Sequence, residues 1–311
     1  MNLKVSVIGA GFVGTMTAHR IVEKNMADVV LVDIMEGIPQ GKALDIAQAA
    51  SIEGFEAKVK GTNDYSEISG SCVVVVTAGF ARTPGMTREE LAVKNGKVVK
   101  TVTEKIREFA PESIILMVTN PLDVMTHLAY KVSGFPARRV MGMGGVLDTA
   151  RYCYLLAEAL KVSVKDVRAL VLGSHGDTMI PLERYATVSG IPVRNLLNKD
   201  RLRKIIERTK HSGAEIVGLL KTGSAFHAPS AAAVYMVEAI VLERPKILPA
   251  SVYLNGQYGI RGIYLGAPIQ LGPAGVEKIY EVDLSREELA ALKTSADMAK
   301  QTFKNLMTHE I

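Results

Sequence analysis

The sequence predicts an α/β fold in which a doubly wound parallel sheet is followed by an α+β domain. In the first half, short apolar runs alternate with longer amphipathic ones, which is typical of parallel strands covered by helices on both faces. A glycine-rich turn directly follows the first apolar run. After about residue 144 this alternation stops, and several helices precede a strand-rich stretch interrupted by glycine and proline.

The first half contains the clearest periodic signals. Its expected strands are short, apolar and rich in β-branched residues, and one of them contains four consecutive valines. Thr87 followed by Glu89 and Glu90 is a good helix start, because acidic side chains suit the positive end of the helix dipole. The expected strands are 3–8, 29–32, 72–77 and 114–118, and the expected helices are 14–24 and 87–109.

The second half lacks the strand–helix rhythm, so we place a domain boundary between residues 144 and 145. This gives an α/β domain, 1–144, which carries the glycine-rich turn, and an α+β domain, 145–311. The small-residue-rich segment 231–239 is expected either to pack against a second copy of the chain or to belong to the core. The expected elements are helices 147–160, 201–220 and 231–243, a strand 167–172, a strand-rich region 247–282 and a final helix capped by Ser285.

Composition argues against several protein classes. The chain has 311 residues, of which 48% are hydrophobic, enough for a large core. The formal net charge of +5 is spread along the chain, so nucleic-acid binding is not expected. No apolar run approaches the roughly 18 residues of a membrane span, and no export signal is visible. Cys72 and Cys153 are expected to be unpaired thiols in a reducing, cytoplasmic compartment, and neither belongs to a metal-binding motif.

The glycine-rich turn 9–14 reads GAGFVG and predicts a dinucleotide site. Gly9 allows the tight turn, Gly11 lets the backbone approach a pyrophosphate, and Gly14 lets helix and strand pack closely. Asp33 ends the second expected strand, where a carboxylate accepts the ribose hydroxyls of NAD and repels the 2′-phosphate of NADP. The context therefore predicts an NAD-binding, Rossmann-type domain.

His175 is the histidine with the strongest functional context. It follows an expected strand and lies between Gly173 and Gly176, at the end of the strand where α/β proteins place their sites. Asp148 and Arg151 share a helix face, so they form either an ordinary intrahelical ion pair or part of a site. A dehydrogenase needs a base that titrates near neutral pH, a carboxylate to orient it and a fixed cation for the substrate. For His175 a purely structural role stays open on this reasoning.

Two arginines lie in the segment 80–88, which reads FARTPGMTR. Pro84 and Gly85 indicate a loop. Arg82 and Arg88 are either solvated surface charges or part of an anion-binding site, and the loop sequence alone does not decide between them.

The joint pattern resembles the lactate/malate dehydrogenase superfamily over essentially the whole chain, and most closely its lactate-dehydrogenase-like malate branch of bacteria. The motifs that carry the resemblance are GAGFVG, Asp33, TAGFARTPGMTR, VTNPLD, GVLDTAR and GSHGD, in the family's order. Three positions depart from the usual pattern: Ala81, Gly144 and Ser174. The last of these also occurs in lactate enzymes.

The resemblance implies a role for each substrate-site residue. His175 accepts the proton in malate oxidation and donates it in oxaloacetate reduction, and Asp148 hydrogen-bonds His175. Arg151 binds the α-carboxylate, while Arg88 polarises the carbonyl. Arg82 occupies the position that separates malate enzymes from lactate enzymes, because it pairs with the second carboxylate of the substrate.

The resemblance also implies cofactor contacts beyond the glycine-rich turn. Asn120 contacts the substrate and places the nicotinamide end, and Asn95 and Val118 join Gly9, Gly11, Gly14 and Asp33 as cofactor-binding residues. The implied activity is NAD-dependent interconversion of (S)-malate and oxaloacetate, within the tricarboxylic acid cycle, by a homotetramer or a dimer. Two alternatives remain: another 2-hydroxyacid dehydrogenase such as a lactate enzyme, and a non-catalytic NAD-binding protein.

Overall fold

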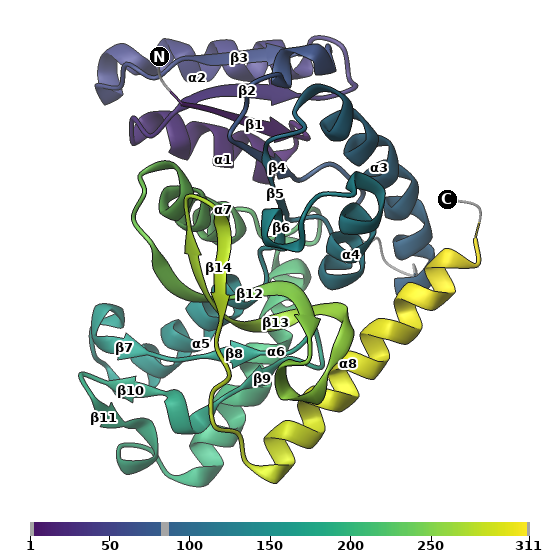
Figure 1. The fold of residues 1–311 in the computed structure, drawn as a ribbon. Helices are drawn as coiled ribbons and strands as arrows, with labels where there is room; N and C mark the ends of the chain where they lie inside the picture. The colour runs from purple at the N-terminus through teal and green to yellow at the C-terminus, as the bar shows by residue number, and fades with distance from the viewer. Residues whose placement is uncertain (1–2, 82–86, 310–311) are drawn as a thin grey trace.

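The computed structural model describes residues 3–81 and 87–309, except for the side chain at position 88. At its centre is a nine-stranded sheet in the order β14-β13-β12-β6-β5-β4-β1-β2-β3 (Figure 1). The six strands nearest the N-terminus are parallel, and their order is that of a doubly wound dinucleotide-binding fold, as predicted. They are β1 (Lys4–Ile8), β2 (Asp28–Val32), β3 (Val59–Thr62), β4 (Val73–Val76), β5 (Ile114–Met117) and β6 (Val140–Gly142).

Helices cover both faces of this sheet, and the four valines of β4 show why. Val73 and Val75 belong to the core cluster that includes α1 and α7, whereas Val74 and Val76 belong to the cluster of α3 and α4. All four are fully buried, so the continuous apolar run correctly predicts a strand with no solvent-facing side. The covering helices are α1 (Phe12–Glu23), α3 (Arg88–Phe109), α4 (Leu122–Ser133) and α7 (His227–Val241).

The main sheet continues across the predicted boundary at residue 144. Three antiparallel strands extend it, and β12 joins β6 where Ser251 pairs with Gly142. The second half of the chain therefore shares a sheet with the first half. The added strands are β12 (Lys246–Asn255), β13 (Arg261–Gly272) and β14 (Gly275–Ile279).

The remaining elements lie around α5 (Gly145–Leu160), α6 (Lys199–Leu220) and α8 (Arg286–Met307), and α8 runs along one side of the molecule to contact α3 and α4 (Figure 1). The single strand expected over 167–172 is wrong. It is two short strands in separate small sheets, because β7 pairs with β10 while β8 pairs with β9. These strands are β7 (Val167–Arg168), β8 (Val171–Leu172), β9 (Ile180–Pro181), β10 (Thr187–Val188) and β11 (Ile191–Pro192).

Helix ends follow the local chemistry where capping residues exist. Thr87 and Ser285 each form a capping box, with Glu90 and Glu288 as the reciprocal partners, and both starts were predicted. By contrast, the sequence pattern does not predict α2 (Ile38–Glu53). That helix carries large apolar side chains on its exposed side as well as its buried side, so it shows no amphipathic period.

Helix α7 buries most of segment 231–239 inside the chain, as the core alternative expects. Ala232, Ala233 and Ala239 are buried within the chain, where α7 packs against α1. The small side chains thus serve close packing of two helices inside one molecule. The helix also begins at His227, four residues before the predicted start at 231.

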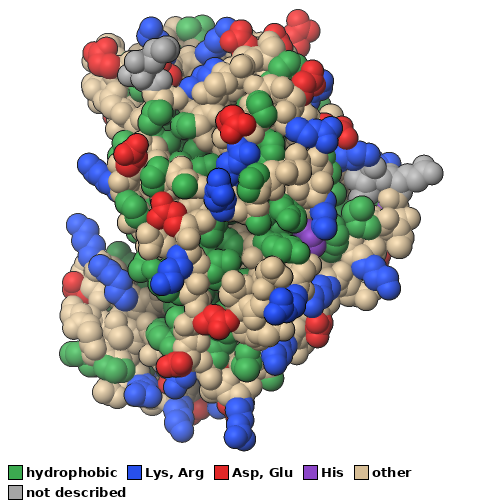
Figure 2. All heavy atoms as spheres, viewed as in Figure 1, with side chains coloured by type: hydrophobic (Ala, Val, Ile, Leu, Met, Phe, Trp, Pro, Cys, Tyr) green, Lys and Arg blue, Asp and Glu red, His purple; other side chains and the backbone are tan. Residues whose placement is uncertain are grey.

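The face of the molecule drawn in Figure 2 shows no single dominant charge. On the face in Figure 2, Lys and Arg side chains lie scattered among acidic and uncharged ones. Across residues 3–81 and 87–309, no helix combines the length and apolar character needed to cross a membrane.

Candidate active site

The glycine-rich turn joins β1 to α1 at the carboxyl end of the sheet. Gly9 has φ +104°, and a Cβ there would lie 2.6 Å from the backbone nitrogen of Ala78. A Cβ on Gly14 would collide with the carbonyl oxygen of Gly9, whereas a Cβ on Gly11 would meet nothing within 4 Å. Gly9 and Gly14 are therefore required for packing, and Gly11 leaves open space beside the start of α1, where a pyrophosphate fits.

Asp33 lies immediately after β2 and faces this turn. Its Oδ2 accepts a hydrogen bond from the backbone nitrogen of Ala10 at 2.6 Å, and its Oδ1 accepts one from Met35 at 3.0 Å. An ionised carboxylate oxygen has more than one lone pair, so both oxygens can still accept hydroxyl groups. The half-buried Asp33 carboxylate is thus held in place by the backbone and suits a ribose diol.

Lys42 and Phe12 lie beside the glycine-rich turn, and neither was predicted from the sequence to belong to the site. The Lys42 ammonium donates to the carbonyl oxygen of Ala10 at 2.5 Å and lies 5.8 Å from the ring centre of Phe12. The Phe12 ring stacks on Phe226, which immediately precedes α7. A cation at this turn adds to the attraction for phosphate. No sequence motif marks Lys42, because α2 itself was not predicted.

Asn95, Asn120 and Val118 lie together at the carboxyl ends of β4 and β5. Asn95 is fully buried, and its amide bonds the backbone of Phe80 in both directions and the carbonyl oxygen of Asn120 at 2.7 Å. The Asn95 side chain therefore holds together the loop at Phe80 and the loop at Asn120. Asn120 is exposed at the site, and the Val118 nitrogen donates to the Val76 carbonyl oxygen at 2.9 Å. The cofactor roles of all three stay predictions.

His175 and Asp148 are brought together from different elements. His175 follows β8, and its Nδ1 lies 2.9 Å from Oδ2 of Asp148 in the first turn of α5. Since a carboxylate only accepts, Nδ1 carries the proton and Nε2 is the nitrogen left for proton exchange. Burial lowers the pKa of His175, but the charge and hydrogen bond of Asp148 outweigh it, so the pKa lies above its usual value.

Arg151 lies one helical turn beyond Asp148 on the same face. Its guanidinium nitrogen is 3.9 Å from Oδ1 of Asp148, which is too long for a hydrogen bond. Among the described residues, neither Nε of Arg151 nor Oδ1 of Asp148 has a hydrogen-bond partner, although both atoms are buried. Such a guanidinium is suited to a planar carboxylate. The long intrahelical ion pair is therefore present, but it is part of a larger arrangement, because the Asp148 carboxylate also accepts a hydrogen bond from His175.

The two loop arginines are at the limit of what the structure describes. Arg82 lies outside the described residues. Arg88 is the first residue of α3, and its backbone position next to the Thr87 cap is all that is described. Their predicted roles therefore rest on the sequence. Elsewhere in the described chain, no group of three or more His, Cys, Asp or Glu side chains has an arrangement that could hold a metal ion.

Asp123 was missed by the sequence argument although it lies in the VTNPLD motif. It is buried on α4 and hydrogen-bonds Ser174 and the backbone nitrogen of His175. Its sequence signals are its place in that motif and a charged side chain among apolar helix neighbours.

The assembled groups are a histidine paired with a carboxylate, a buried guanidinium and a phosphate-binding turn. Proton exchange next to a dinucleotide is the chemistry of a hydroxyacid dehydrogenase. Residues 3–142 match the family model for the lactate/malate dehydrogenase NAD binding domain, and residues 145–310 match that for the alpha/beta C-terminal domain.

The chain belongs to the lactate/malate dehydrogenase family. A malate dehydrogenase of Roseiflexus sp. (strain RS-1) is 52% identical over 98% of this chain and 99% of its own length. The malate dehydrogenase of Salinibacter ruber has a structure with TM-score 0.94 at 49% identity, covering 98% of each chain. A Cryptosporidium parvum lactate dehydrogenase, solved with lactic acid and NAD, has TM-score 0.97 at 40% identity, covering 100% of this chain and 99% of its own.

These relatives identify the protein as an NAD-dependent oxidoreductase of the lactate/malate dehydrogenase family. The fold itself does not separate the two substrate classes, because both a malate and a lactate enzyme superpose closely on it. Substrate choice within this family must come from individual side chains.

Proposed function

We propose that this protein is a malate dehydrogenase, catalysing reversible conversion of (S)-malate and NAD to oxaloacetate and NADH. The observation that carries the proposal is the His175–Asp148 pair beside Arg151, in a chain about half identical to proteins named malate dehydrogenase. Arg82 is the sequence feature that favours a dicarboxylate over lactate.

His175 is the proton-transfer group in this proposal. During malate oxidation its Nε2 takes the proton of the substrate hydroxyl, and the resulting imidazolium is stabilised by Asp148 at Nδ1. During oxaloacetate reduction the same nitrogen returns the proton. When bound, NAD supplies the hydride acceptor, and Gly9, Gly11, Gly14 and Asp33 would hold it, with Asn95, Val118 and Asn120 at the nicotinamide end.

The arginines bind and polarise the substrate. Arg151 holds the α-carboxylate through its planar fork. Arg82 pairs with the distal carboxylate, whose burial without a counter-charge would cost several kcal/mol. Arg88 stabilises negative charge on the carbonyl oxygen in the transition state.

A lactate dehydrogenase is the second candidate. It is supported by the close structural similarity of this chain to the C. parvum lactate dehydrogenase. A lactate enzyme needs a small neutral group where Arg82 stands, since pyruvate has a methyl group there. A non-catalytic NAD-binding protein is disfavoured because His175, Asp148 and Arg151 are all present and two of them are hydrogen-bonded to each other.

The deciding experiment is NADH-linked reduction of oxaloacetate and of pyruvate, measured side by side at saturating NADH. A kcat/KM for oxaloacetate that exceeds the value for pyruvate by more than about a hundredfold is expected, because burying Arg82 opposite a methyl group leaves it unpaired. Faster reduction of pyruvate would reject the malate assignment in favour of the lactate one. No turnover of either keto acid would reject both.

We further propose a cytoplasmic homotetramer, with a dimer as the alternative and a place in the tricarboxylic acid cycle. Free Cys72 and Cys153 support a reducing compartment. The exposed apolar side chains of Ile38, Leu44 and Ile52 on α2 support burial against another subunit. Sedimentation that shows only monomer at micromolar concentration would reject the oligomer.

A further inference from the structure

Asp123 is a fully enclosed carboxylate between the two halves of the chain. It lies on α4, is 2% exposed and accepts three hydrogen bonds. Its Oδ2 accepts from the Ser174 hydroxyl at 2.6 Å and from the backbone nitrogen of His175 at 2.9 Å. Its Oδ1 accepts from the Ser251 hydroxyl, on β12, at 2.6 Å. One side chain therefore connects α4, β12 and the loop that carries His175.

The hydrogen-bond pattern indicates that Asp123 is ionised. A backbone N–H can only donate, and O–H to carboxylate distances of 2.6 Å fall in the range of charge-assisted bonds. Burial raises the pKa of Asp123 above its ordinary value, and hydrogen bonds from the Ser174 and Ser251 hydroxyls and the His175 backbone nitrogen offset part of that rise. The three donors thus favour a negative charge next to the backbone of His175, against the cost of burying it.

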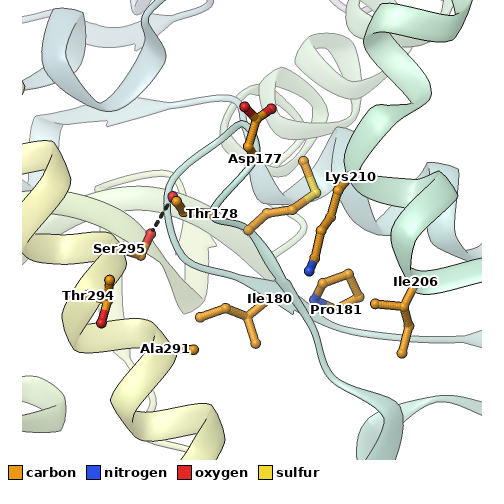
Figure 3. Close-up of a pocket in the computed structure, with 10 residues that line it drawn as sticks. Asp177, Thr178, Ile180, Pro181, Ile206, Lys210, Ala291, Thr294 and Ser295 are labelled. Atoms are coloured by element: carbon orange, nitrogen blue, oxygen red, sulfur yellow. Dashed lines mark hydrogen bonds between the residues drawn. The ribbon is translucent and has the colours of Figure 1, made fainter. Parts of the chain in front are cut away.

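A second anchor, on α8, holds the same loop. Ser295 of α8 is fully buried, and its hydroxyl accepts a hydrogen bond from the backbone nitrogen of Ser174 at 2.9 Å. The same hydroxyl lies 2.9 Å from Oγ1 of Thr178 (Figure 3). Thr178 and Ser295 both border a pocket of about 320 Å³ beside the loop. The peptide that carries His175 is therefore fixed between Asp123 and α8.

We propose that Asp123 is a positioning residue for proton transfer, which holds the His175 backbone in register with Asp148 and adds a second negative charge beside the imidazole. The inference rests on the proposed function, in which His175 exchanges the substrate proton. Asp123 is proposed to act through His175, without contacting substrate or cofactor.

The charge has a consequence that a purely structural residue would lack. Among the described residues, the charged groups that act on His175 are Asp148 and Arg151 from α5 and Asp123 from α4. Arg151 lowers the pKa of His175, whereas both carboxylates raise it. Removing the Asp123 charge should therefore make the imidazolium easier to deprotonate.

Asp123→Asn separates the charge from the geometry. An amide oxygen in the place of Oδ2 keeps the bonds from Ser174 and His175, and the amide nitrogen donates to the Ser251 hydroxyl, which accepts as well as donates. The acid limb of kcat/KM for malate oxidation should move to lower pH by about half a pH unit or more. The exposed Asp297→Asn on α8 removes a solvated charge and should leave the limb in place.

Asp123→Ala removes the tether as well as the charge. We expect kcat on the pH plateau to fall by at least about tenfold, because a displaced base transfers protons poorly. The Kd for NADH, from fluorescence titration, should stay close to wild type. If the Asn variant does not fold, Ser174→Ala is the substitute. It removes the hydroxyl that most stabilises the Asp123 anion, and it should move the limb in the same direction by a smaller amount.

The inference is overturned if the acid limb of the kcat/KM profile in Asp123→Asn coincides with that of wild type. The same holds for Ser174→Ala where it is used as the substitute. A wild-type kcat in Asp123→Ala would overturn it too. All comparisons are made on whichever keto acid or hydroxy acid the wild-type enzyme turns over. Failure of the proposed function would instead appear as an inactive wild-type protein, or as one that prefers pyruvate.

Discussion

Oδ2 of Asp148 lies 2.9 Å from Nδ1 of His175, while Oδ1 of the same carboxylate lies 3.9 Å from the guanidinium of Arg151. One carboxylate thus orients the base and stands beside the cation that is proposed to bind substrate. The side chain is 3% exposed, so water does not screen these interactions strongly. Proton transfer and substrate binding are expected to be coupled through Asp148.

His175→Ala should abolish turnover and leave NADH binding nearly unchanged. The imidazole is the proposed proton donor and acceptor, whereas the cofactor is held by the turn after β1. Fluorescence titration measures binding, and a coupled absorbance assay measures turnover. The exposed His309→Ala is the matched control and should keep wild-type activity. Turnover at the wild-type rate in His175→Ala would remove the residue from the mechanism.

The pH dependence should report the raised pKa of His175. Malate oxidation needs the neutral imidazole, so its kcat/KM should rise with pH and level off only above the usual histidine value of about 6.5. Oxaloacetate reduction needs the imidazolium and should fall over the same interval. Asp148→Asn removes the main group that raises this pKa, so burial dominates and both limbs should move to lower pH. An unmoved limb in Asp148→Asn would contradict the pairing.

Arg151→Lys should be severe even though the positive charge is kept. An ammonium group cannot reproduce the two parallel hydrogen bonds of a guanidinium to a carboxylate. We expect kcat/KM for oxaloacetate to fall by more than about tenfold, which corresponds to about 1.4 kcal/mol. Arg203→Lys on the exposed face of α6 serves as the control and should be neutral. A smaller loss would mean that another cation holds the α-carboxylate.

Arg82→Gln tests the substrate assignment directly. Without the guanidinium, the distal carboxylate of oxaloacetate is desolvated with no counter-charge, which typically costs about 3–5 kcal/mol, or roughly two to four powers of ten in kcat/KM. Pyruvate reduction should improve, because the unpaired cation opposite its methyl group is gone. If the ratio of the two kcat/KM values stays within about threefold of wild type, less than about 1 kcal/mol of discrimination rests on Arg82.

Asp33→Ser combined with Ile34→Arg should shift preference towards NADP. The serine removes the charge that repels a 2′-phosphate, and position 34 is 82% exposed, so an arginine there can reach a phosphate from solvent. The ratio of kcat/KM for NAD and NADP is the measurement. Ile34→Arg alone keeps the carboxylate and is the control. An unchanged ratio in the double variant would count against Asp33 as the ribose ligand.

Several features of this protein were determined by the sequence itself, because short-range chemistry fixes them. The valines of β4 predict a doubly buried strand, and the spacing of Gly9, Gly11 and Gly14 predicts a phosphate-binding turn. The caps at Thr87 and Ser285 satisfy backbone groups within three residues of themselves. In each case the residues that determine the local structure are close to one another in the sequence.

Only the tertiary structure decided how distant segments share the site. Asp123 bonds Ser251 from 128 positions away, and Ser174 donates to Ser295 from 121 positions away. Likewise β12 extends the first domain's sheet through Ser251 and Gly142. Hydrogen bonds of this kind depend on which segments of the chain lie side by side in the folded protein. The local sequence pattern of either segment does not predict that contact. A buried carboxylate reads in the sequence as a lone polar residue, and its partners become visible only when the chain is folded.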